Sequence, residues 1–228
     1  FTMGKGHDYN FKDFDPEYER VVEIYNSWGS SECTKKEGNE LPISSTGKKG
    51  SQEAPEGSVM KALERGLRFG LVAGGLDDRG FYAPFYEGGQ EQYPPGLTAI
   101  IAPEYNRTSL MDALYNRSCY ATTGDKIILG LTVAGYGIGQ EASTAEKHGL
   151  NICRHIAGFV AGNSEIYSVE ILRNGKPLKT FEPEGNSIDF IFDDMDPLQK
   201  VTLSSKERKT PFVFYMIRVT MTNGHRAW

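Results

Sequence analysis

Hydrophobic and polar positions follow two different patterns along the chain, and the change falls near residue 120. Before it, short apolar runs alternate with helical patterns. The runs at 20–28, 67–75 and 96–104 predict strands, because they are short and rich in β-branched or aromatic residues. The patterns at 58–66 and 109–117 predict helices. This alternation predicts an α/β segment containing a parallel sheet.

After residue 120 apolar and polar residues alternate, with turn signals between the segments. Alternation with a period of two is typical of strands that bury one face. Six segments show this pattern: 127–135, 151–162, 166–182, 187–194, 199–205 and 212–224. Within the third, the sequence RNGK at 173–176 predicts a hairpin turn, because Asn-Gly accepts the positive φ that such turns need. No helix is predicted in this half, which we expect to form a β-sandwich.

The change of pattern divides the chain into two predicted domains, an α/β domain at 1–123 and a β-sandwich at 124–228. With 228 residues, 39% of them hydrophobic, the chain has an ordinary globular composition. Its net charge of −5 argues against nucleic acid as a partner, since nucleic-acid binders usually carry a basic excess. No apolar run approaches the roughly 20 residues of a membrane-spanning helix, so no membrane span is predicted. Three widely spaced cysteines fit neither a disulfide framework nor a CxxC metal site, and we interpret them as structural thiols.

Two long stretches without a regular pattern, residues 29–57 and 77–95, are predicted loops. Loops of this length are usually functional or disordered. Aromatic residues in or beside them could form a platform for a sugar or another flat ligand, or could pack the loops themselves. They are Trp28, Tyr82, Phe85, Tyr86 and Tyr93.

Charged residues gather directly after the second predicted strand, in the sequence LVAGGLDDRG at 71–80. The carboxyl ends of parallel strands open into a shared crevice, where α/β folds place ligand-binding groups. Asp77, Asp78 and Arg79 are therefore candidates for a metal or phosphate site. The structural alternative is a solvated turn in which Arg79 pairs with a carboxylate.

Two further residues are candidates for the same site. Glu32 follows the first predicted strand and could reach the same crevice, or could be a surface residue of a polar loop. His7, next to Asp8, is either a metal ligand or an exposed histidine near the start of the chain.

Several segments of the chain resemble successive blocks of one bacterial family. In the first half these are 15–32, 66–75, 96–104 and 113–129, of which the last, with CYATTG, is the most specific. The segments 167–176 and 215–228 resemble the β-sandwich appended in that family. The family is catalogued as domain of unknown function 3604 and is similar to the polymerase-and-histidinol-phosphatase (PHP) metal-dependent hydrolases.

The resemblance implies an α+β fold class, with a partial PHP-like (β/α) barrel segment followed by a β-sandwich. It also implies a cluster of His, Asp and Glu ligands for divalent metals (Mn, Zn, Fe or Mg) that hydrolyses phosphate esters. Three strands cannot close a barrel, so we expect the chain to be an incomplete piece of a longer protein. We also expect it to cover its open sheet by forming a homodimer.

The alignment at the second strand exit has two versions. Where the family reads Gly-Ser-Asp-x-His, this chain reads GGLDD at 74–78. Aligned without a gap, Leu76 takes the place of the aspartate and Asp78 that of the histidine. Shifted by one residue, Asp77 keeps the aspartate position and Arg79 takes that of the histidine. The resulting assignments are catalytic roles for Asp77, Arg79 and Glu32, and metal binding for Asp78 and His7.

Two functions follow as hypotheses. The first is a metal-dependent hydrolase that acts on a small-molecule phosphate ester. The alternative is a non-enzymatic binding module for a carbohydrate or a protein, built on the β-sandwich and the aromatic loops. Metal analysis of the purified protein distinguishes the two, because the hydrolase requires bound metal.

Overall fold

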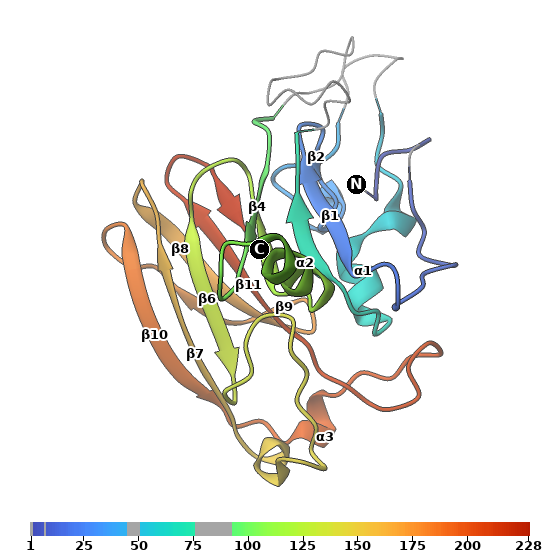
Figure 1. Ribbon diagram of the computed structural model, residues 1–228, viewed down its shortest axis with the longest axis vertical. Helices are drawn as coiled ribbons and strands as arrows, with labels where there is room; N and C mark the ends of the chain where they lie inside the picture. The colour runs from blue at the N-terminus through green and yellow to red at the C-terminus, as the bar shows by residue number, and fades with distance from the viewer. Residues whose placement is uncertain (1, 7, 45–50, 76–92) are drawn as a thin grey trace.

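The computed structural model describes residues 2–6, 8–44, 51–75 and 93–228 (Figure 1). In these residues twelve strands outweigh three α-helices and three short 3-10 helices. The strands are β1 (Val21–Asn26), β2 (Gly29–Ser30), β3 (Gly70–Ala73), β4 (Leu97–Ile100), β5 (Cys119–Thr122), β6 (Ile128–Val133), β7 (Arg154–Ala161), β8 (Ile166–Arg173), β9 (Lys176–Phe181), β10 (Ser187–Asp194), β11 (Tyr215–Met221) and β12 (Arg226–Ala227). The α-helices are α1 (Val59–Glu64), α2 (Arg107–Tyr115) and α3 (Leu198–Val201), and the 3-10 helices are η1 (Lys35–Glu37), η2 (Pro55–Gly57) and η3 (His148–Asn151).

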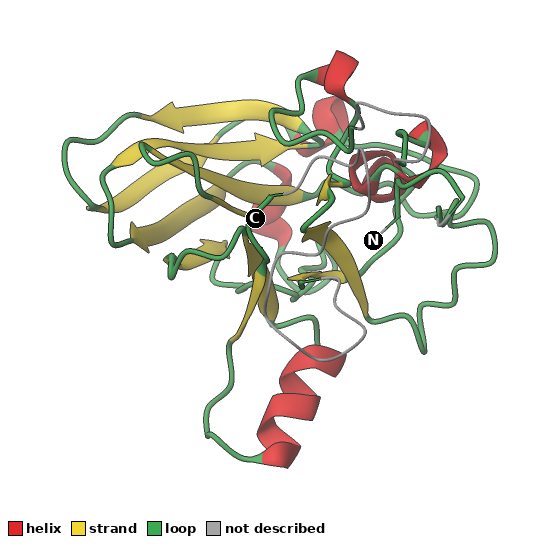
Figure 2. Cartoon of the chain, turned by 90° about the horizontal axis from the view of Figure 1, so that it is seen from above, coloured by secondary structure: helices red, strands yellow, loops and turns green. Residues whose placement is uncertain are grey.

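The strands form three sheets. The largest has six strands in the order β4-β5-β12-β11-β8-β9, and a second has the order β10-β7-β6. The third has the order β2-β1-β3, and in it β1 and β3 run parallel. Seen from above, the long strands gather on one side of the molecule, and the longest helix, α2, projects away from them (Figure 2).

The main hydrophobic core lies between the six-stranded sheet and the β10-β7-β6 sheet. Alternate residues of β6, β7 and β10 face alternate residues of β8 and β11, as the period of two predicts. Ile156 and Val160 on β7 are almost fully buried, and so are Ile171 on β8 and Val219 on β11. The two sheets therefore pack as a sandwich.

The described residues up to the end of β3, which we call the N-terminal layer, cover the other face of the six-stranded sheet. Its buried side chains include Phe11, Ile24 and Val59, which belong to one cluster with Leu172 and Trp228. The six-stranded sheet thus has a hydrophobic core on each face, and both depend on it. It contains β4 and β5 from before residue 123 as well as later strands, while the predicted boundary at that residue stays a prediction.

The predicted fold class is wrong. The described residues form a β-rich fold with no closed barrel, and not a partial (β/α) barrel segment followed by a β-sandwich. After the parallel pair β1–β3, strand β4 pairs antiparallel with β5 and so joins the large sheet. An apolar run indicates that a strand is buried, but it carries no information on which strand it pairs with or in which direction.

Shorter predictions had mixed outcomes. The hairpin at RNGK is confirmed: β8 and β9 are joined there, and Asn174 and Gly175 both have positive φ. The strand predicted at 199–205 is wrong, because α3 occupies its first part after Pro197. In the part of the chain that the structure describes, no helix has the length and apolarity needed to cross a membrane.

Candidate functional site

Four of the five predicted site residues, His7, Asp77, Asp78 and Arg79, lie outside the described residues. Glu32 is described and is almost fully buried. Its Oε1 lies 2.8 Å from Nη1 of Arg218, and its Oε2 accepts a 2.8 Å hydrogen bond from Nε1 of Trp228. Glu32 therefore connects the N-terminal layer to β11 and to Trp228, which follows β12. Its catalytic role stays a prediction.

The metal cluster that the resemblance implies is not assembled by the described residues. Within them, no three His, Cys, Asp or Glu side chains are arranged so that they could hold a metal ion. The predicted aromatic platform is also mostly outside the described ranges. Of its two described members, Trp28 is buried and Tyr93 donates a hydrogen bond from its hydroxyl to the carbonyl of Pro42.

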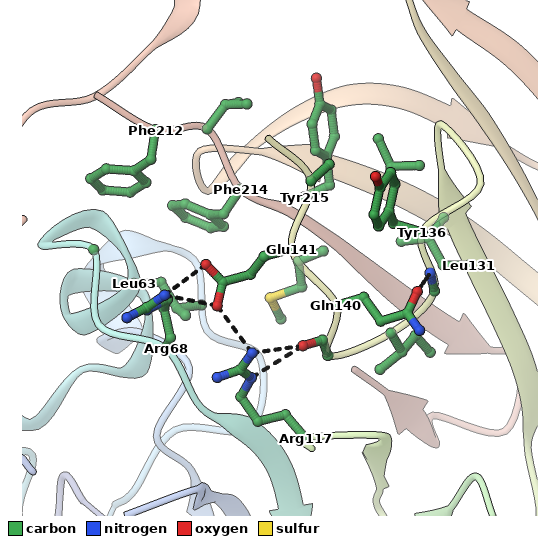
Figure 3. A pocket seen from close by; sticks show the side chains of 18 of the residues that line it. Leu63, Arg68, Arg117, Leu131, Tyr136, Gln140, Glu141, Phe212, Phe214 and Tyr215 are labelled. Carbon is green, nitrogen blue, oxygen red and sulfur yellow. Dashed lines mark hydrogen bonds and ion pairs between the residues drawn. The ribbon is translucent and has the colours of Figure 1, made fainter. Parts of the chain in front are cut away.

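A pocket of about 590 Å³ lies where the N-terminal layer meets the sandwich (Figure 3). Most of its lining comes from four segments far apart in the sequence. They are the α1–β3 connection (63–71), the turn after α2 (117–120), the end of β6 with the segment that follows it (131–146), and the approach to β11 with the start of that strand (208–217). Its volume falls in the range of small-molecule sites, roughly 300–1,000 Å³. Several charged side chains also converge in it, and these two features together make it our candidate functional site among the described residues.

Three arginines converge on one carboxylate in this pocket. Nη1 of Arg68 lies 2.9 and 2.7 Å from the two carboxylate oxygens of Glu141. Nη2 of Arg117 lies 3.0 Å from Oε1, and Nη2 of Arg208 lies 3.5 Å from Oε2. Arg117 also donates two hydrogen bonds to the carbonyl of Gly139, which holds the segment after β6 against the turn after α2.

The charges in this cluster do not cancel. Burial, together with the neighbouring arginines, lowers the pKa of Arg117 and of Arg208. Burial alone would raise the pKa of Glu141, but its contacts with the arginines lower it overall. Glu146 also lines the pocket, and even when both glutamates are counted against the three arginines a positive excess remains. An anion is the ligand that such an excess favours.

Apolar side chains form the larger part of the remaining wall, which also includes serine, threonine and glutamine side chains. Leu63 and Leu67 come from the α1–β3 side, Phe212 and Phe214 from the approach to β11, and Tyr136 from the turn after β6. Figure 3 shows Phe212 and Phe214 on the side where Arg68 and Glu141 meet, with Tyr136 on the opposite side. The pocket therefore has a charged end and a mainly apolar body.

No pattern in the sequence indicates this cluster. Arg68, Arg117, Glu141 and Arg208 stand singly, separated by tens of residues, and belong to no motif. They meet because β5 and β11 lie in one sheet, with β3 packed beside β5. Because these strand pairings were not predicted, the charged residues that they bring together could not be predicted either.

Comparison with known proteins gives a family without an assigned activity. Residues 78–155 match the family described as protein of unknown function (DUF3604). An uncharacterised protein of Chlamydia trachomatis is 53% identical over 230 residues, and one of Chlamydia muridarum is 51% identical over the same length. Each alignment covers 100% of this chain and 36% of the relative. No solved structure matches the chain.

These findings support the resemblance to domain of unknown function 3604, while the relationship to the PHP hydrolases stays a prediction. The chain spans about a third of the length of its chlamydial relatives. Over residues 78–155 it is similar to the DUF3604 family, and over its whole length to uncharacterised proteins of Chlamydia.

Proposed function

We propose that this chain binds a small-molecule phosphate ester in the pocket, with the phosphate group on Arg68, Arg117 and Arg208. One observation carries the proposal: three guanidinium groups from separate segments share a single carboxylate, that of Glu141. Guanidinium groups match the geometry of phosphate oxygens and stay charged at all physiological pH values.

Glu141 does not use all the N–H donors of the arginines, so these side chains can also bind a second anion. A guanidinium group carries five N–H donors. The contacts to Glu141 use only Nη1 of Arg68, which reaches both carboxylate oxygens, and Nη2 of Arg208, which approaches Oε2. The other donors of these two side chains are the groups that we assign to the phosphate. Arg208 is the loosest partner of Glu141, at 3.5 Å, and is thus the arginine that turns most easily to a ligand.

Calorimetric titration of the whole chain with inorganic phosphate at low ionic strength tests the proposal. We expect binding that weakens at least tenfold in Arg208→Gln and also weakens as salt is added. Arg107→Gln is the matched control, because Arg107 is exposed on α2 and does not line the pocket. The proposal fails if the unaltered chain does not bind phosphate, or if both variants weaken binding equally.

A metal-dependent phosphoesterase is a second candidate, and one observation favours it. Strands β1 and β3 run parallel, with Tyr25 paired to Ala73 near their carboxyl ends, and the sequence after β3 leads to Asp77 and Asp78. A divalent metal, when bound, activates water for attack on a phosphate ester. We expect this candidate to show near-stoichiometric Mn, Zn or Fe in the purified chain, and less metal in Asp78→Asn. Metal-free protein that cannot hydrolyse an aryl phosphate after metal is added would contradict it.

A further inference from the structure

We infer that the ligand of this pocket carries a flat apolar group next to its phosphate, as an aryl phosphate does. This inference rests on the proposed function and adds the chemical class of the ligand's body. A phosphate on the arginines fills only the charged end of a pocket of about 590 Å³. The remaining volume belongs to the organic part of the ligand.

Apolar side chains make up the larger part of the walls around that volume. Leu63, Leu67, Phe214 and Tyr136 are each partly exposed, although they line a concave surface. A polar body such as a sugar would place hydroxyl groups against Leu63, Leu67 and Phe214, whose side chains offer no hydrogen-bond partner, and this is unfavourable. An apolar body gains free energy by covering the same surface.

Aromatic rings lie directly beside the charged end. The guanidinium carbon of Arg208 lies 5.0 Å from the centre of the Phe212 ring. Phe212 itself is buried, and its ring lies so close to Gly66 that a Cβ added there would come within 2.9 Å of Cε1. A group bonded to the phosphate therefore lies close to aromatic rings. Flat groups pack on such rings in stacked or edge-on arrangements.

The test compares three probes by calorimetry on the whole chain: phenyl phosphate, glycerol phosphate and inorganic phosphate. We expect phenyl phosphate to bind at least tenfold more tightly than the other two. Phe214→Leu should weaken phenyl phosphate at least fivefold and leave inorganic phosphate unchanged. Phe159→Leu is the matched control, because Phe159 is exposed on β7 and does not line this pocket.

The outcomes separate the inference from the function on which it rests. Equal affinity for the three probes, or tighter binding of glycerol phosphate, overturns the apolar body and leaves phosphate binding in place. Unchanged phenyl phosphate affinity in Phe214→Leu, with the same melting temperature as the unaltered chain, also overturns it. If none of the probes binds, the proposed function itself fails.

Discussion

Individual residues in this chain are held by buried charge pairs, and Asp194 is the clearest case. Its Oδ1 contacts Arg173 and its Oδ2 contacts Arg154, at 2.7 and 2.8 Å, and Oδ2 also accepts a hydrogen bond from the hydroxyl of Tyr215. Burial would raise the pKa of Asp194, but these donors lower it to about 2. The carboxylate therefore stabilises the fold over most of the pH range.

We predict that Asp194→Asn lowers the free energy of unfolding by about 3–5 kcal/mol at pH 7, because it leaves buried arginines without their counter-charge. The folded-state pKa is below the ordinary value of 3.8, so this contribution is present above that value and is lost as the pH falls towards 2. Urea unfolding at pH 7 and pH 3 should show a smaller difference at the lower pH. Asp193→Asn, an exposed neighbour paired with His155, should cost no more than about 1 kcal/mol. Equal costs for the two variants would contradict the prediction.

Two of the three cysteines, Cys33 and Cys119, have thiols that the fold shields partly or fully from solvent. Burial, with the nearby carboxylates of Glu32 and Glu37, raises the pKa of Cys33 to about 12, and burial raises that of Cys119 to about 11. The thiolate is the reactive form. We predict that at pH 8 both thiols of the folded chain react with iodoacetamide at least about tenfold more slowly than in the urea-unfolded chain, after allowing for the greater nucleophilicity of a basic thiolate. Mass spectrometry of the labelled peptides measures the two rates, and similar rates would show that these thiols are not buried as described.

Single residues also show what the sequence can and cannot indicate. The helix predicted at 58–66 begins with Ser58, whose side chain caps α1 by accepting a hydrogen bond from the backbone N–H of Lys61. The burial of Glu32 is not readable, since its partners Arg218 and Trp228 lie nearly two hundred residues away. A polar side chain next to a strand could equally face solvent, a ligand or a distant arginine.

At the scale of elements, most long strands follow from local pattern and the short ones do not. Strand β10 coincides with its predicted segment, and β6 and β7 lie within theirs. Strand β5 has four residues buried in succession, and β12 has only two residues, so neither shows an alternating pattern. Strands β5 and β12 connect the two halves of the large sheet. This explains why the set of strands in that sheet was not predicted.

The turn of the β8–β9 hairpin lies against α1. Gly175 has a φ of +75°, and a Cβ there would lie 2.8 Å from Sδ of Met60. We expect Gly175→Ala to destabilise the chain by about 1–2 kcal/mol, from backbone strain and from contact with α1. Gly185 has a φ of +92° with nothing near its Cβ position, so Gly185→Ala isolates the strain alone and should cost less. Thermal unfolding of both variants measures the difference, and a larger cost at Gly185 would refute the packing contribution.

At the scale of the whole molecule, the six-stranded sheet carries a hydrophobic core on each face. Neighbouring residues on β8 illustrate this, because Ile171 belongs to the sandwich core and Leu172 to the core under the N-terminal layer. Both side chains are fully buried. The two cores are therefore joined by one backbone.

We predict that Ile171→Ala and Leu172→Ala each cost about 2–5 kcal/mol, the usual cost of truncating a fully buried aliphatic side chain. Because one sheet supports both cores, each variant should shift a single cooperative transition. Far-ultraviolet circular dichroism and tryptophan fluorescence should then give the same midpoint, since both tryptophans lie in the N-terminal layer or beside the large sheet. Two separate transitions, each sensitive to one variant, would instead support independent domains at 1–123 and 124–228.

The order of strands in the large sheet has a consequence for how the chain folds during synthesis. Strands β4 and β5 reach β11 and β8 only through β12, which is made more than a hundred residues after β5. Until the ribosome has delivered β12, the antiparallel pair of β4 and β5 has an unpaired edge at β5, and such edges promote association between chains. Contacts between residues so distant in sequence also slow folding. The newly made chain is thus most in need of chaperone protection while residues 123–225 emerge.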